Sequence, residues 1–378
     1  MNVKVTKELC SNRISKKLTS NFIELGYGLQ VEAMNAEMFF NRSFEPFFPY
    51  REINKVWFDL YTEDIGEYWF YEDQAKDKSY EKDWSKFDWY HSGYEHNAWY
   101  AFPGMSGDGE IADESTFVVE KAPEHEIRIG YTENDYHGKY AMQVVNDSEI
   151  WGGLAQDGKY CVPNMNYLFR GAIKNVSNAA EIRIEIYREG ETTDPVACVE
   201  LCGITGELKE HTAEFTVPAE GRYTFALVIP PHSEILCDDF SLFPGDHVGA
   251  WKKSAVQAGQ YVAPAVIRFP GGCVASFYDW HEGIGRKRTP DYSWFWGGYN
   301  YNDIGVDELA QYMEALGAGG MYCVNMHHPF KKYYEFVPVD QRGESPDNPD
   351  IPGAAKHHRE MKKYADLEWG AQDTANLV

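Results

Sequence analysis

The sequence lacks any hydrophobic run long enough to cross a bilayer, and it lacks the apolar stretch of a signal peptide near its start. Positive charge is also scarce, because 35 Lys and Arg face 59 Asp and Glu, for a formal net charge of −24. A surface this acidic disfavours nucleic acids and anionic membranes as partners. We therefore expect a cytoplasmic protein that binds neither of them.

Cysteine is sparse and follows no pairing pattern; the seven residues are Cys10, Cys161, Cys198, Cys202, Cys237, Cys273 and Cys323. An odd, scattered set argues against a disulfide framework and for a reducing compartment. Cys198 and Cys202 have no second Cys or His pair at zinc-site spacing. His327 and His328 are adjacent and would face opposite ways on a strand. We expect no metal at either pair.

Aromatic residues, in contrast, are plentiful at 15% of the chain, including 26 Tyr and 11 Trp. Tyr and Trp present a flat apolar face with a polar edge, which a sugar ring requires of a binding surface. Ordinary packing is the simpler explanation for any single ring. The length of 378 residues and the hydrophobic content of 43% allow two or three domains with sizeable cores.

Residues 1–50 form the first of three blocks. They contain a short alternating strand, the segment SNFIELGYG and a helix-like run, QVEAMNAEMFF. Met34, Met38 and Phe39 lie at helical spacing in this run, which predicts that they share one face of a helix.

Residues 51–246 form a second block of different character. A polar stretch rich in Tyr and Trp precedes many short strand-like segments separated by turn-forming residues. Short alternating strands at roughly even spacing are typical of a β-sandwich. In residues 181–189 the three isoleucines face one side of a strand, and Arg183, Glu185 and Tyr187 face the other.

Residues 247–378 form the third block, in which helices and strands alternate. We expect helices over about 248–261 and 306–316, the second ended by Gly317, with a buried strand following each. A last helix is expected from about residue 355 onward. This rhythm is typical of a parallel sheet or barrel.

The strand that begins at Val266 runs directly into the turn Pro270-Gly271-Gly272. Proline cannot continue a central strand, and glycine adopts backbone angles that other residues cannot. Rings and carboxylates follow at Tyr278, Asp279, Trp280, His281 and Glu282. A strand that ends in this way is typical of a ligand site at the carboxyl end of a parallel sheet.

Five segments in order now carry a family resemblance; they are FIELGYG (22–28), NAEMFFNRSFE (35–45), IRFPGGC (267–273), YDWHEGIG (278–285) and MYCVN (321–325). Together they resemble the α-L-arabinofuranosidases of glycoside hydrolase family 51. The layout is similar too, since some members carry a β-sandwich inserted after the NRSFE segment, and CDDFSLFPGD (237–246) resembles its closing strand.

The resemblance implies an α/β plus all-β chain: an incomplete (β/α)8 TIM-type barrel with an inserted antiparallel, jelly-roll β-sandwich of the carbohydrate-binding type. Its domains are 1–50 as the start of the catalytic barrel, 51–246 as the sandwich and 247–378 as the continuation of the barrel. The implied activity is retaining hydrolysis of terminal non-reducing α-L-arabinofuranosyl residues in arabinan or arabinoxylan oligosaccharides.

The resemblance also assigns substrate-binding positions, which are Glu24, Cys273, Trp280, Trp296 and Asn325. Glu24 stands where the family has a glutamate that binds the arabinose hydroxyls, and a carboxylate accepts two such hydrogen bonds at once. Cys273 stands where many members have an asparagine, which changes the contact made with the ring. Each position also has a purely structural explanation. Glu24 would be a surface glutamate, Cys273 a small buried thiol, Asn325 a turn residue that ends a strand, and the tryptophans rings packed within a loop.

Retaining glycosidases need two carboxylates about 5 Å apart, and the resemblance supplies neither of them here. The family's acid/base follows the fourth barrel strand and its nucleophile follows the seventh, whereas this sequence offers three such strands, at 20–26, 265–269 and 320–325. We expect the chain alone to be inactive and truncated before the fourth strand. The alternative is a non-catalytic carbohydrate-binding protein that uses the sandwich.

The expected partners are arabinose-containing oligosaccharides and, because a sheet of three barrel strands has unpaired edges, either a complementary C-terminal fragment or a second copy of the chain. Carboxylate chemistry needs no organic cofactor. Asp238 and Asp239 are the candidate ligands for a structural Ca²⁺ in the sandwich, since hard cations take oxygen ligands.

Overall fold

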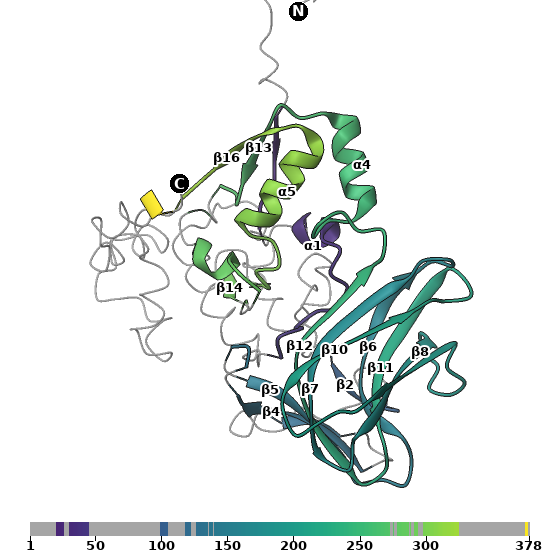
Figure 1. Cartoon of the computed structure of the whole chain (residues 1–378). Helices are drawn as coiled ribbons and strands as arrows, with labels where there is room; N and C mark the ends of the chain where they lie inside the picture. The colour runs from purple at the N-terminus through teal and green to yellow at the C-terminus, as the bar shows by residue number, and fades with distance from the viewer. Residues whose placement is uncertain are drawn as a thin grey trace, which may run out of the picture.

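The computed structural model describes residues 20–25, 30–44, 99–104, 118–121, 126–134, 136–138, 140–272, 275, 278–286, 288, 291–293, 298–324 and 375–376. These residues form two units, a parallel α/β unit and a β-sandwich, joined by the segment that follows the first helix (Figure 1). No helix in these ranges is long and apolar enough to cross a membrane.

The α/β unit is built on three parallel strands, β1 (Ser20–Phe22), β13 (Val266–Phe269) and β16 (Gly319–Tyr322), in the order β1-β13-β16. They match the three stretches that the sequence predicts as strands, except that β16 begins one residue before its predicted stretch and is mostly exposed, not buried as expected. Segments more than 200 residues apart are therefore neighbours, because Ser20 pairs with Val266. That these strands belong to an incomplete (β/α)8 barrel stays a prediction.

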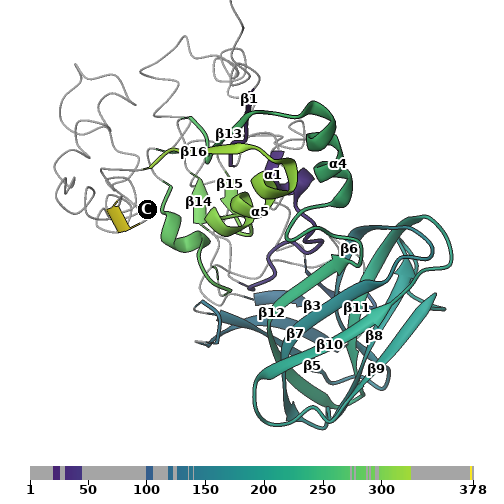
Figure 2. The same ribbon diagram turned by 45° about the horizontal axis from the view of Figure 1, so that its top comes forward.

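Helices α1 (Gln30–Met34), α4 (Lys253–Val262) and α5 (Val306–Leu316) accompany this sheet (Figures 1 and 2). Buried Leu309 and Tyr312 of α5 share one core with Ile267 and Phe269 of β13. The predicted helix 306–316 is confirmed, and it ends as expected at Gly317, whose φ is 66° and whose N–H reaches the carbonyl of Glu314. Glycine adopts this left-handed conformation without the steric cost that a side chain adds.

The expected helix through Phe39 is wrong, because α1 ends at Met34. Asn35 terminates it, since its side-chain oxygen accepts the N–H of Glu37 at 3.0 Å. The chain then leaves as an extended segment toward the sandwich. Met34 packs in the α/β core, whereas Met38 and Phe39 pack in the sandwich core, so the helical spacing of these residues is incidental.

The sandwich consists of two antiparallel sheets in the described part of the chain, ordered β10-β7-β12-β5-β4-β3 and β2-β6-β11-β8-β9. The strands are β2 (Tyr100–Phe102), β3 (Val118–Lys121), β4 (Ile127–Glu133), β5 (Tyr140–Asn146), β6 (Gly152–Cys161), β7 (Tyr167–Ser177), β8 (Glu181–Arg188), β9 (Ala197–Cys202), β10 (Lys209–Phe215), β11 (Gly221–Ile229) and β12 (Ser233–Pro244). The predicted β-sandwich is thus confirmed.

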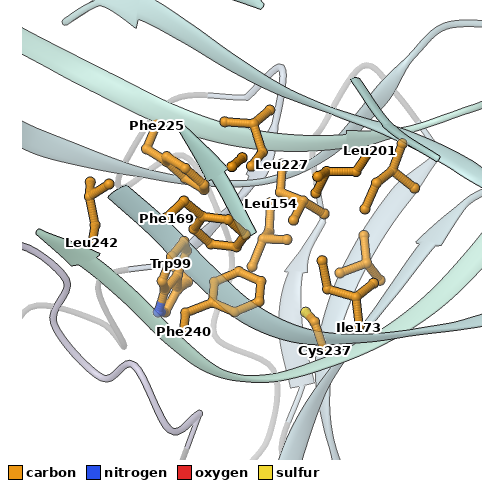
Figure 3. Packing of buried hydrophobic residues seen from close by; sticks show 14 of the residues in the cluster. Trp99, Leu154, Phe169, Ile173, Leu201, Phe225, Leu227, Cys237, Phe240 and Leu242 are labelled. Carbon is orange, nitrogen blue, oxygen red and sulfur yellow. The ribbon is translucent and has the colours of Figure 1, made fainter. Parts of the chain in front are cut away.

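Aromatic rings fill the space between the two sheets (Figure 3). Phe169 of β7 lies 5.2 Å from Phe225 of β11, and Phe240 of β12 meets Phe169 edge-on at 5.1 Å, measured between ring centroids. Trp99 closes the cluster, 5.7 Å from Phe240. Burying each such ring contributes about 1.5–3 kcal/mol, so this cluster is a main source of the sandwich's stability.

Strand β8 shows both the success and the limit of its sequence pattern. Its three isoleucines point into the core as expected. Glu185 and Tyr187 face the opposite side, but they too are buried, and the Tyr187 hydroxyl donates to the Glu185 carboxylate. On the same outer face, Asp157 accepts hydrogen bonds from the hydroxyls of Tyr100 and Thr224, each at 2.6 Å.

Candidate functional site

The carboxyl ends of β1 and β13 meet at Glu24 and the Pro-Gly-Gly turn. Backbone hydrogen bonds continue the pairing past the strands, since the N–H of Leu25 donates to the Pro270 carbonyl at 2.8 Å. The Glu24 side chain is 8% exposed, and its Oε1 atom accepts the N–H of Gly272 at 3.1 Å. The structure therefore places the predicted glutamate against the predicted turn, at the sheet edge where α/β proteins bind ligands.

Gly271 is required by this arrangement. Its φ is 153°, and a Cβ atom there would lie 2.7 Å from Cγ of Glu24. Only a residue without a side chain lets the turn approach the glutamate so closely. The turn and Glu24 are thus one local unit, although they lie about 250 residues apart in the sequence.

Trp280 lies in a short 3-10 helix, η5 (Trp280–Gly283), within the loop that follows β13. Asp279 caps this helix by accepting the N–H of His281 at 3.0 Å, and it also contacts the His281 ring at 2.8 Å. The Trp280 ring stacks on the His281 ring with centroids 3.8 Å apart. Trp280 is positioned by these local contacts and by packing against the α/β core, and its contact with a sugar stays a prediction.

Two further rings lie beside β13 and were not singled out as binding residues. Buried Tyr278 meets Phe269 edge-on at 6.1 Å, and Tyr322 of β16 lies 5.7 Å from the same ring. Burial raises the pKa of the Tyr278 hydroxyl, so it is neutral at physiological pH. The aromatic run after the turn thus serves partly as core, as the packing explanation anticipates.

The remaining predicted positions, Cys273, Trp296 and Asn325, lie outside the described residues, as does the pair His327 and His328. The strand leading to Asn325 is nevertheless in place, since the N–H of Cys323 donates to the Phe269 carbonyl at 2.8 Å. The end of β16 is therefore next to the end of β13.

Asp238 and Asp239, the candidate calcium ligands, are engaged by protein groups. Asp238 accepts the N–H of His137 at 3.0 Å, and Asp239 accepts from the Arg42 guanidinium at 2.9 Å. Burial alone would raise the pKa of the Asp239 carboxyl, but neighbouring His137 and Arg42 hold it below its usual range. In the portion of the chain that is described, no group of three His, Cys, Asp or Glu side chains has the placement of a metal site; calcium binding stays a prediction.

The segment 35–44, which joins α1 to the sandwich, is held by two ionisable side chains, Glu37 and Lys159. The Glu37 carboxylate accepts the N–H groups of Met38 and Leu242 at 3.0 and 2.9 Å, and burial raises its pKa to about 7. Lys159 donates to the Met38 carbonyl at 2.6 Å, and burial lowers its pKa to about 7. The segment that carries the NRSF motif is thus fastened to strands β6 and β12 of the sandwich, which the family resemblance did not indicate.

Residues 259–376 match the sequence model of the family described as Alpha-L-arabinofuranosidase 1 domain. Alpha-L-arabinofuranosidase C of Emericella nidulans is 32% identical over 80 residues, which are 20% of this chain and 16% of that enzyme. The intracellular exo-alpha-(1->5)-L-arabinofuranosidase of Halalkalibacterium halodurans is 24% identical over 121 residues, which are 28% of this chain and 24% of that enzyme. The chain thus matches less than a quarter of the length of these curated relatives.

The solved structure of an arabinose-bound MgGH51 α-L-arabinofuranosidase superposes with a TM-score of 0.56 at 13% identity, covering 93% of this chain and 52% of that one. At this identity the likeness shows the fold, an α/β unit with a β-sandwich. Taken with the sequence matches, it confirms the resemblance seen in the motifs. The chain is similar, over part of its relatives' length, to the family 51 α-L-arabinofuranosidases.

Proposed function

We propose that this chain supplies the sugar-recognition part of a retaining α-L-arabinofuranosidase acting on terminal non-reducing arabinofuranosyl residues of arabinan or arabinoxylan oligosaccharides. The observation that carries the proposal is the Glu24 carboxylate, buried at the joined ends of β1 and β13 and held by the N–H of Gly272 at 3.1 Å. A carboxylate at this position suits the hydroxyls of a sugar.

The family resemblance assigns the acid/base and the nucleophile to positions without a counterpart in this sequence. We therefore expect the 378-residue chain to bind arabino-oligosaccharides without hydrolysing them. The test pairs a hydrolysis assay on p-nitrophenyl α-L-arabinofuranoside with calorimetric titration of arabino-oligosaccharides. Turnover by the chain alone would overturn the assignment of the missing carboxylates.

The role of Glu24 is tested by the variant Glu24→Gln, which keeps the volume and removes the charge. Hydrogen bonds to a charged group contribute about 1.5–3 kcal/mol, so we expect affinity for arabino-oligosaccharides to fall about 10- to 150-fold. Glu314→Gln, on the exposed side of α5, is the matched control and is expected to bind as the wild type does. Unchanged affinity in Glu24→Gln would place the sugar elsewhere, as the sandwich-binding alternative requires.

An exposed strip on the parallel sheet supports association with further strands. The strand register puts Phe22, Arg268 and Met321 side by side, with the Arg268 guanidinium 4.8 Å from the centre of the Phe22 ring. Phe22 and Met321 are 43% and 54% exposed, whereas the helices pack against the opposite face. In a barrel this strip would face the interior, which side chains from other strands fill.

A complementary C-terminal fragment or a second copy of the chain would cover this strip. Light scattering after size-exclusion chromatography, with Met321→Glu as the variant and Val176→Glu, at an exposed position of β7 in the sandwich, as a control outside the strip, tests the idea. We expect association that Met321→Glu abolishes. A monomer that does not change when the C-terminal part of a family 51 enzyme is added would contradict it.

A further inference from the structure

Arg42 of the NRSF segment bridges the two units of the molecule. Its Nη1 atom lies 2.9 Å from Oδ1 of Asp239 in β12 of the sandwich, and its Nε atom lies 2.6 Å from Oδ1 of Asp303, just before α5. The three side chains are largely buried. Salt screens such pairs much less than it screens pairs in solvent, so one guanidinium couples the sandwich to the α/β unit.

His137, in the turn between β4 and β5, forms a second connection. Its backbone N–H donates to Asp238, and its Nδ1 atom lies 3.2 Å from Oδ1 of Asp239. Its Nε2 atom lies 2.7 Å from the carbonyl oxygen of Arg288, in the loop that joins β13 to α5. The imidazole is fully buried, so His137, held to the sandwich through its backbone N–H and Asp238, contacts the backbone of that loop through its ring.

Hydrogen bonds of Arg288 also hold the loop together internally. The Arg288 guanidinium donates to both oxygens of Glu308 at 2.8 Å, and to the backbone carbonyls of Asn302 and Asp303 at 3.1 and 3.0 Å. Its Nε atom donates to the Gly285 carbonyl at 2.8 Å. Arg288 therefore links the middle of the loop, at Gly285, and its last residues to the first turn of α5. Bidentate pairs of this kind fix orientation as well as distance.

Arg286 of the same loop also approaches Asp239, with its Nε atom 3.5 Å from Oδ2. The Asp239 carboxylate of the sandwich is therefore contacted both by Arg42 of segment 35–44 and by Arg286 of the loop. Arg286 contacts Glu210 of β10 as well. The same loop begins at Gly271 and Gly272 and carries Trp280, which are the turn and the ring of the candidate sugar site. The sandwich contacts are therefore made to the loop that the site depends on.

We propose that the β-sandwich positions the sugar site, with Arg42 and His137 as positioning residues that hold the loop between β13 and α5. The proposal rests on the proposed function only in treating this loop as part of the sugar site. It makes the sandwich a structural component of substrate recognition, whether or not the sandwich itself binds sugar.

The experiment is hydrogen–deuterium exchange on the full chain, comparing the wild type with Arg42→Met and His137→Asn. Arg222→Met is the matched control, because Arg222 pairs with Glu189 at 2.9 Å within the exposed part of the sandwich. We expect amides of residues 298–305 to exchange at least about tenfold faster in the two test variants, while β11 and β12 keep their protection. The control is expected to match the wild type in these amides.

Calorimetric titration of arabino-oligosaccharides on the same proteins provides the second readout. Affinity is expected to fall at least about fivefold in His137→Asn and to stay unchanged in Arg222→Met. If Arg42→Met does not fold, His137→Asn decides the question. Equal protection of residues 298–305 in His137→Asn and the wild type would overturn the proposal, as would a uniform loss of protection across the sandwich.

A wild-type chain that binds no arabino-oligosaccharide would instead refute the proposed function. The exchange comparison would still decide whether the sandwich holds the loop, so the two failures are distinguishable.

Discussion

Gly271 offers a stringent test of the geometry at the candidate site. In Gly271→Ala, a φ of 153° would be imposed on a residue with a side chain, which costs about 1–3 kcal/mol. The new Cβ atom would lie 2.7 Å from Cγ and 2.9 Å from Oε1 of Glu24, so the carboxylate must move away from the N–H of Gly272. Losing that hydrogen bond adds about 1 kcal/mol. We expect the free energy of unfolding of the α/β unit to fall by about 2–4 kcal/mol.

Gly272→Ala is the matched control, one residue further along the same turn. A Cβ atom at Gly272 would lie 3.8 Å from both Oε1 of Glu24 and Cζ of Phe22, which is ordinary van der Waals contact. The backbone N–H that donates to Glu24 is also kept. We therefore expect a change within about 1 kcal/mol, including any gain from the reduced entropy of the unfolded chain.

Urea denaturation followed by tryptophan fluorescence measures both variants, and the midpoints give the difference in stability when the slopes agree. Sugar titration completes the assay, because displacement of Glu24 in Gly271→Ala should weaken arabino-oligosaccharide binding at least about tenfold. The same midpoint for the two alanine variants would refute the reasoning, since it would mean that Gly271 is not pressed against Glu24.

Three further predictions concern the joining segment and the sandwich. The pKa of Glu37 is raised from 4.5 to about 7 in the folded protein, so its protonation stabilises the fold fully below pH 4.5, and this contribution is lost as the pH rises through 7. Glu37→Gln should therefore flatten the pH dependence of thermal stability between these two pH values. A variant whose stability depends on pH as strongly as that of the wild type would contradict this prediction. Phe240→Ala should destabilise the sandwich by about 3–5 kcal/mol, measured by chemical denaturation, and a loss below about 1 kcal/mol would show that the cluster of Figure 3 is not tightly packed. Ile184→Val, in the same core, should cost only about 0.5–1.5 kcal/mol, and a larger loss in the same denaturation experiment would indicate that removal of one methyl group is not tolerated locally.

Several elements were predictable because their signals are local. The stripe of α5 and its end at Gly317 depend on one turn of backbone and on the periodicity of eleven residues. The alternation of β8 likewise needs only a strand with one face in the core, and the isoleucines take that face. Glu24 was identified through the family resemblance, and the glycine turn through the strand that runs into it. Their contact across about 250 residues follows from the parallel pairing of β1 and β13.

Other features depend on neighbours that the sequence does not reveal. The periodic run through Phe39 predicts a helix, but the helix ends at Met34, and Met38 and Phe39 pack in the sandwich core instead. The buried outer face of β8 is a similar case, because alternation shows that Tyr187 faces away from the isoleucines without showing what it contacts.

By itself, the amino-acid sequence determined the two kinds of architecture, the three parallel strand segments and the family resemblance, since these follow from periodicity and from short contiguous motifs. Only the tertiary structure decided that Arg42, His137 and Arg288 converge with Asp239 and Asp303. The reason is physical: charges are buried together only when several distant segments fold against one another, and no local pattern records which carboxylate each of them will meet.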